Sequence, residues 1–140
     1  MKEKRNLHLK VQELCDCYAT TDPLREMSAI DREPDREEGA LKWLALAALH
    51  GVNHNAESIT LRKTRNGDFR VFAEYRVTEL PAPGREVGEK ILAAVREITH
   101  IEGKKGKTPL ALGIRNDSLE LKIRIESKDG AEKVKIHFPG

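Results

Sequence analysis

The sequence predicts an α+β fold, in which a largely antiparallel five-strand sheet carries helices on one face. Apolar and polar residues alternate along residues 57–78, expected as a hairpin, and along 109–138, expected as a three-strand meander. Apolar residues recur at helical spacing along about 3–19, 35–50 and 85–101. The first pattern indicates strands with one buried face, and the second indicates amphipathic helices. Strands and helices do not alternate strictly, which favours α+β over a parallel sheet.

The last turn of the meander sets one strand register. Asp129-Gly130 suits a two-residue turn, because both positions of that turn need a positive φ. Closing it places Ile125 opposite Val134 and gathers the apolar residues of both strands on one face. A slip of one residue would send those side chains to water.

The first turn of the meander is expected at Asn116-Asp117, which places Ile114 opposite Leu119. This turn also brings the apolar residues of its two strands to one face. Because two independent turns lead to the same buried face, the meander is the best-defined part of the predicted fold.

The hairpin at 57–78 is expected to close through a three-residue loop at 65–67. That loop pairs Leu61 with Val71 and puts Gly67 in the left-handed conformation of a bulge. A two-residue Asn-Gly turn would turn Val71 to the wrong face, so burial of one face overrides the local turn preference.

Helix ends are marked by specific residues. Asp22-Pro23 is typical of an N-cap followed by proline at the first helical position, and Asp35 is expected to cap the next helix. Gly51 is expected to end that helix, since glycine is favoured just after a helix C-terminus.

The helix at 35–50 is apolar nearly all round, with Lys42 as the single charge in its apolar run. Such a helix must be covered on more than one side. Either it lies between the sheet and the N-terminal helices of its own chain, or one flank meets a second subunit. The second interpretation makes Trp43, Leu46 and Ala47 an oligomer contact, with a dimer favoured.

The composition is that of a soluble, folded protein, with 34% charged residues and a mean hydropathy of −0.57. At 140 residues, we expect a single domain, 1–140, in which 1–34 forms a helical arm able to pack on a partner subunit. The first residues lack the apolar region of a signal peptide, and no apolar run reaches the length of a membrane span. These features predict a cytoplasmic protein without a membrane partner.

Four residues are candidate metal ligands: Cys15, Cys17, His50 and His54. The spacing of the cysteines is not the C-x₂-C of metal or redox motifs, and residues two apart on a helix point in different directions. The histidines are four apart, which would suit a shared metal on a helix, but Gly51 suggests that the helix has ended there. The sequence therefore favours no metal and no cofactor.

No catalytic motif is present in the sequence. It lacks a G-x-S-x-G elbow, a P-loop and a glycine-rich dinucleotide motif. An enzyme is therefore not favoured. A small-molecule enzyme or binder would need a pocket between helix 85–101 and the sheet.

The most distinctive predicted surface is basic. The alternation places several lysines and arginines on the polar face of the sheet, and residues 103–107 add a basic, glycine-flanked loop. The expected binding surface consists of Arg62, Arg70, Arg76, Lys104, Lys105, Lys107, Arg115, Lys122, Arg124, Lys133 and Lys135. Such a surface could contact phosphates. It could also be solvated, or dock against the acidic segment 22–38 of the same or another chain.

The residues therefore lead to three hypotheses of function. The favoured one is a non-catalytic binding or regulatory protein that self-associates. The second is an accessory nucleic-acid-binding protein that uses the basic face and the loop at 103–107. The third is a small-molecule enzyme or binder.

Overall fold

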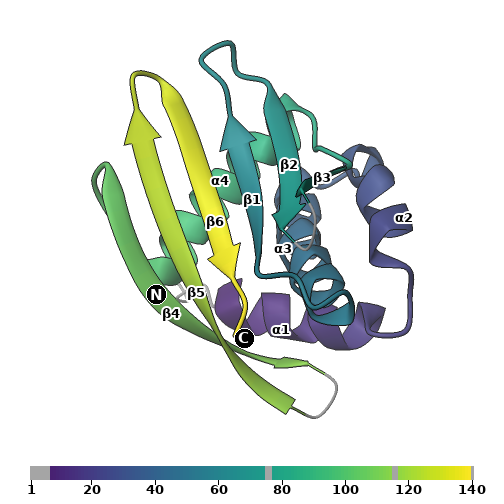
Figure 1. Ribbon diagram of the computed structural model, residues 1–140. Helices are drawn as coiled ribbons and strands as arrows, with labels where there is room; N and C mark the ends of the chain where they lie inside the picture. The colour runs from purple at the N-terminus through teal and green to yellow at the C-terminus, as the bar shows by residue number, and fades with distance from the viewer. Residues whose placement is uncertain (1–6, 75–76, 115–116, 140) are drawn as a thin grey trace, which may run out of the picture.

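The computed structural model describes residues 7–74, 77–114 and 117–139, and within these ranges one antiparallel sheet carries helices on one face (Figure 1). The strand order is β3-β2-β1-β6-β5-β4. The elements are α1 (Leu7–Tyr18), α2 (Pro23–Ser28), the 3₁₀ turn η1 (Ile30–Arg32), α3 (Arg36–Asn53), β1 (Ser58–Lys63), β2 (Phe69–Glu74), β3 (Val77–Leu80), α4 (Arg85–Thr99), β4 (Lys105–Ile114), β5 (Asp117–Lys128) and β6 (Ala131–His137). The α+β class with a single antiparallel sheet is confirmed, but the sheet has six strands rather than five.

The sixth strand arises because the expected second strand of the hairpin is two strands. The expected second strand of the hairpin at 57–78 is divided into β2 and β3, which pair with each other. Leu80 lies opposite Val71 and is buried. The residues between the two strands, Tyr75-Arg76, lie outside the described ranges. Neither is glycine, proline or asparagine, so turn chemistry gave no indication of a break.

The hairpin of β1 and β2 closes as predicted. Leu61 lies opposite Val71, and Gly67 has a φ of 88°. The loop is held by a hydrogen bond from the Thr64 amide to the Asp68 carbonyl, at 2.9 Å. Burial of one strand face did override the preference for the shorter turn.

The registers of the meander are confirmed in one hairpin and wrong by two residues in the other. Ile125 does lie opposite Val134, but Ile114 lies opposite Asp117 rather than Leu119. The predicted Asn116-Asp117 turn falls partly outside the described residues. A shift of two leaves the buried face unchanged, so alternation alone could not detect it.

The observed register of β4 and β5 is consistent with the packing at the start of β4. Gly106 lies opposite Ile125, and a Cβ on Gly106 would overlap the side chain of Ile101. The glycine therefore lets the connection from α4 pack closely on the sheet. Residues 105–107 belong to β4, so most of the expected basic loop is a strand.

Helix α3 is covered on all sides by its own chain. It packs against α1, α2 and α4 and lies behind the sheet (Figure 1). The side chains of Trp43, Leu46 and Ala47 are 1%, 0% and 0% exposed, so they present no surface to another subunit. The intramolecular sandwich accounts for the apolar run, since α1, α2 and η1 all pack against α3. No helix within the described ranges combines the length and apolarity needed to cross a membrane.

Gly51 does not end α3, which continues to Asn53. A Cβ on Gly51 would overlap the ring of Phe138. The position is therefore glycine because Phe138 packs closely on the helix, and not because a left-handed cap is needed.

The expected caps at the starts of two helices are confirmed: Asp22 and Asp35 accept amide hydrogen bonds at the starts of α2 and α3.

Lys42, the only charge in the apolar run, joins three elements of the helical layer. Its Nζ lies 3.2 Å from Glu26 and 3.0 Å from Glu33, and 4.6 Å from the centre of the Tyr18 ring. Burial disfavours the charged amine, but the hydrogen bonds to Glu33, Tyr18 and Glu26 more than compensate and raise the pKa of Lys42. The ion-paired lysine thus ties α1, α2 and η1 to α3.

Strand β4 is an edge of the sheet, and α1 covers part of that edge. The Gln12 side chain donates to the Gly113 carbonyl at 2.6 Å and accepts from the Gly113 amide at 2.6 Å. The His8 ring lies 2.6 Å from the Ala111 carbonyl. Residues two apart direct their backbone groups to the same side, so Pro109, which has no N–H, faces this edge too. These residues protect the edge from pairing with another strand.

We expect a Gln12→Leu variant to self-associate more than the parent protein and to lose about 1–3 kcal/mol of unfolding free energy. Leucine would leave the Gly113 amide and carbonyl without their partner and would open the edge to a second strand. Urea unfolding and sedimentation velocity over a range of concentrations measure the two effects. Glu13→Leu, at the exposed neighbouring position of α1, is the control. Equal stability and equal association of the two variants would show that Gln12 does not protect the edge.

Candidate basic site on the outer sheet face

Three cations lie side by side across three strands on the face that the helices leave open. Lys107 of β4 is opposite Arg124 of β5, and Arg124 is opposite Lys135 of β6. The same line continues through Thr60 of β1 to Phe72 of β2. We call these five residues the central row. Like charges directly opposite each other destabilise a sheet, so the central row carries an electrostatic cost.

Several basic residues of this face are neutralised within the chain. Lys135 lies 3.1 Å from Glu74, and Lys133 lies 3.7 Å from Glu126. Arg70 forms a two-pronged ion pair with Glu79, with N–O distances of 2.8 and 3.0 Å, which raises the pKa of its guanidinium. Ion pairs thus neutralise Lys133, Lys135 and Arg70 around the middle of the sheet.

Three cations at the β4–β5 side are not neutralised in this way. Within the described part of the chain, Lys107, Lys122 and Arg124 have no carboxylate close enough for an ion pair. They line an open hollow of about 440 Å³ on the outer face, together with Glu120 and the end of β6. We call this the basic hollow. A second hollow, of about 370 Å³, shares Lys107 and Arg124 with it and includes Lys105.

His137 lies in the basic hollow, and its titration reflects the surrounding charge. Burial lowers the pKa of His137, and the positive charges of Lys135, Arg124 and Lys122 lower it further, while Glu74 acts in the opposite direction. The ring is therefore neutral at neutral pH. An imidazole whose protonation is opposed by three cations marks a position where an anion would be stabilised.

An aromatic side chain stands at the other end of the central row. The Phe72 ring lies near two guanidinium groups, 5.6 Å from that of Arg62 and 5.3 Å from that of Arg70. Aromatic rings and arginine planes are the surfaces on which proteins stack nucleobases. The outer face therefore combines cations with one flat stacking surface.

The predicted binding residues are only partly brought together. Lys107, Lys122 and Arg124 form the un-neutralised group, and Lys105 lines the neighbouring hollow, with Lys104 just before it in the chain. Arg70, Lys133 and Lys135 are ion-paired, and Arg62 packs on Phe72. Arg76 and Arg115 lie outside the described residues. Sequence reasoning missed His137 and Phe138 as lining residues. A glycine inside the apolar α3 was the available signal for the position of Phe138.

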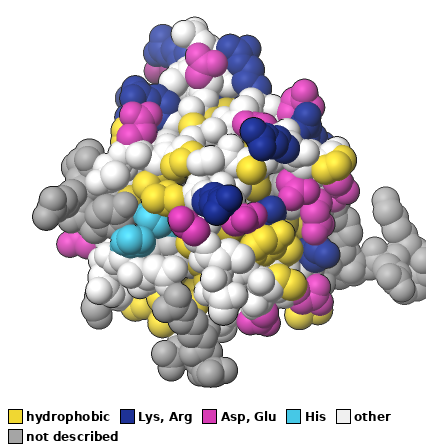
Figure 2. Space-filling model, turned by 90° about the vertical axis from the view of Figure 1, so that its right-hand side faces the viewer, with side chains coloured by type: hydrophobic (Ala, Val, Ile, Leu, Met, Phe, Trp, Pro, Cys, Tyr) yellow, Lys and Arg dark blue, Asp and Glu magenta, His cyan; other side chains and the backbone are white. Residues whose placement is uncertain are grey.

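The acidic segment 22–38 does not cover this face. Its carboxylates are used within the helical layer: Asp22 and Asp35 cap helices, and Asp31 accepts from the Gly84 amide at 2.8 Å. Figure 2 shows the side of the molecule that carries α2, where acidic and basic side chains are interspersed and apolar atoms appear in separate areas. Among the described residues, Leu9 is the only large apolar side chain classed as exposed.

The four candidate metal ligands are not gathered. Cys15 is buried against α3, and this burial, with a smaller effect of Asp16, raises the pKa of its thiol to about 12, while Cys17 is exposed. His50 and His54 do lie side by side, with ring centres 4.3 Å apart, because α3 continues past Gly51. The described residues contain no group of three or more potential ligands placed to hold a metal ion.

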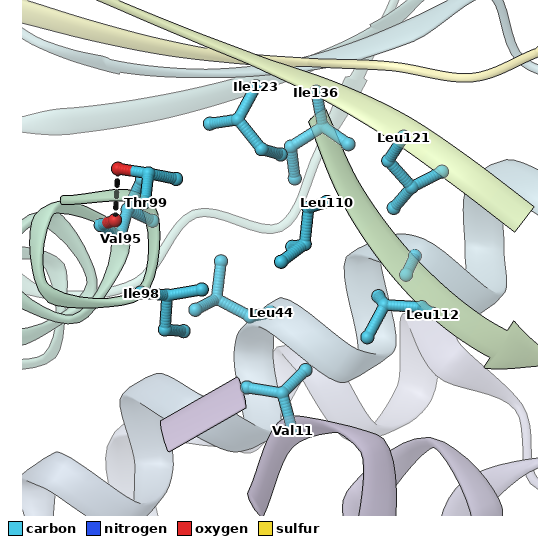
Figure 3. Close-up of a pocket in the computed structure, with 11 residues that line it drawn as sticks. Val11, Leu44, Val95, Ile98, Thr99, Leu110, Leu112, Leu121, Ile123 and Ile136 are labelled. Atoms are coloured by element: carbon cyan, nitrogen blue, oxygen red, sulfur yellow. Dashed lines mark hydrogen bonds between the residues drawn. The ribbon is translucent and has the colours of Figure 1, made fainter. Parts of the chain in front are cut away.

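The space between α4 and the sheet is small and apolar. A cavity of about 20 Å³ lies there, and Figure 3 shows side chains from α1, α3, α4 and strands β4, β5 and β6 converging on it. The one polar side chain on its wall, Thr99, donates to the Val95 carbonyl at 2.7 Å. Ligand sites usually measure about 300–1,000 Å³ and present a few polar groups. This cavity is a packing defect of the core.

No family model matches the chain, and no curated protein matches it at a significant level.

Proposed function

We propose that this chain is a non-catalytic binding protein that docks nucleic acid on the outer face of its sheet. The observation that supports the proposal most is the group Lys107, Lys122 and Arg124, which stand together in the basic hollow without acidic partners among the described residues. Charged residues without a structural role in ion pairs carry the cost of mutual repulsion. A polyanion that bound across them would remove that cost and release its own counterions.

Nucleic acid fits this surface better than an acidic protein does. Lys107 and Arg124 face each other on adjacent strands, and Lys122 lies two residues from Arg124 on the same strand, so the three cations are closely spaced. Phe72 with its two arginines offers a surface for bases. The sequence favoured self-association because the apolar helix at 35–50 needed cover on more than one side. That cover comes from the same chain, so this reason for self-association no longer applies. The small-molecule hypothesis lacks a pocket of sufficient size at the predicted place.

Fluorescence polarisation with labelled DNA and RNA of mixed sequence tests the proposal. We expect binding that weakens as salt rises from about 50 to 200 mM, with a slope of log K against log salt near −2 for three neutralised phosphates of a single strand. Polyglutamate of similar length serves as a competitor, because it shows whether an acidic polypeptide displaces the labelled nucleic acid. Absence of binding at the lowest salt, or equal competition by polyglutamate, would refute the proposal.

A further inference from the structure

A third hollow adjoins the basic hollow at the end of β6. It measures about 630 Å³ and lies between the C-terminal end of α3, the start of β1 and β5. Its walls include Val52, Ala56, Leu119 and Phe138, so it is largely apolar. We call it the C-terminal hollow. His137 to Pro139 form the boundary that the two hollows share.

Phe138 is held in place although it lies close to the end of the chain. Its amide donates to the Glu57 carbonyl at 2.9 Å, and its ring packs on the bare backbone of Gly51. The ring is partly buried and lines both hollows. An aromatic side chain fixed in this way is a preformed stacking surface, because little conformational freedom is lost when a ligand binds to it.

The two hollows together match the two parts of a nucleotide. A phosphate requires cations, which Lys107, Lys122 and Arg124 supply. A base requires a flat apolar surface, which the Phe138 ring supplies, together with polar groups at the rim such as Asn55 and Glu57. In a duplex the bases are paired and stacked inside the helix, whereas in a single strand they can turn outward into a recess.

We infer that the nucleic acid lies on this face as a single strand, with phosphates on the basic hollow and one unstacked base in the C-terminal hollow against Phe138. This inference rests on the proposed function and goes further, because it names the form of nucleic acid and a base-binding residue. The central row extends the same path toward Phe72, over four strand spacings or about 19 Å.

The test compares three probes of about 12 nucleotides on the full-length chain: a single strand, its duplex, and an abasic strand that keeps the sugars and phosphates. We expect the single strand to bind at least about tenfold more tightly than either of the other two, since stacking of one base contributes about 1–3 kcal/mol. Equal binding of the single and abasic strands would overturn the inference while leaving the proposed function intact. Failure of all three probes to bind would overturn both.

A Phe138→Leu variant provides a second readout that does not depend on the probes alone. Leucine keeps apolar volume over Gly51 but removes the aromatic face. We expect about tenfold weaker binding of the single strand, unchanged binding of the abasic strand, and an unchanged salt slope. Thermal unfolding of the variant checks that the fold is retained. Equal losses for both strands would show that Phe138 supports the site rather than contacts a base.

Discussion

Replacing Arg124 with glutamate is expected to weaken nucleic-acid binding by about a hundredfold, the largest effect of any single substitution on this face. Arg124 is the middle cation of the central row, between Lys107 and Lys135, and it lines both the basic hollow and the neighbouring hollow of about 370 Å³. One charge-assisted contact contributes about 1.5–3 kcal/mol, and the new carboxylate would repel a neighbouring phosphate. The measurement is fluorescence polarisation at low salt.

The milder Arg124→Gln variant separates binding from folding. We expect about tenfold weaker binding and a salt slope less negative by about 0.7, the contribution of one phosphate of a single strand. The free energy of unfolding should stay the same or rise slightly, because Lys107 and Lys135 lose a like-charged neighbour. Lys90→Gln, on the exposed side of α4, removes the same charge from the helical layer. If Lys90→Gln weakens binding as much, the effect comes from net charge and not from this site.

Acidification is expected to destabilise the protein by about 3 kcal/mol between about pH 7 and pH 4 through a single residue, His50. Burial lowers the pKa of His50 to about 4, with a smaller contribution from the charge of His54, while Asp22 acts in the opposite direction. In the unfolded chain His50 has a pKa of about 6.5, so it becomes protonated as the pH falls below that value. In the folded chain His50 stays neutral until the pH approaches about 4. Stability is therefore full above pH 6.5 and is lost as the pH falls.

Urea unfolding of the parent and of a His50→Gln variant at several pH values measures this effect. We expect the variant to lose about 3 kcal/mol less than the parent over the same range, whatever its stability at neutral pH. His137, whose pKa is also lowered, contributes to both proteins and cancels in the comparison. His54→Gln is the control, since His54 is exposed and should leave most of the slope in place. Parallel curves for parent and His50→Gln would exclude His50 as the source.

The buried faces of the strands could be predicted because their period is two. Leu61 opposite Val71 and Ile125 opposite Val134 follow from alternation combined with turn chemistry. A register shift of two residues leaves the alternation unchanged, so the pattern could not distinguish the two registers. This explains why Ile114 was placed opposite the wrong residue. The break between β2 and β3 was missed because Tyr75-Arg76 lacks the residues that usually mark turns.

The candidate site could be predicted only as a set of outward-facing cations. Which of them are neutralised depends on the strand order, which sequence pattern does not contain. Glu74 of β2 reaches Lys135 of β6 across β1, and this leaves Arg124 and Lys107 without such a partner among the described residues. The C-terminal hollow depends on Phe138 meeting Gly51, two residues far apart along the chain. Alternation describes one strand at a time, so it could not bring them together.

The contact between Gln12 and Gly113 has a consequence for synthesis on the ribosome. The two residues are 101 positions apart, and the helix comes first. Domains emerge from their N-terminal end during translation, so α1, which covers the β4 edge, is synthesised long before β4. When the hairpin containing Gly113 forms, α1 is already available to cover that edge. The interval in which nascent chains could join edge to edge is therefore short, although the contact is among the most distant in the sequence.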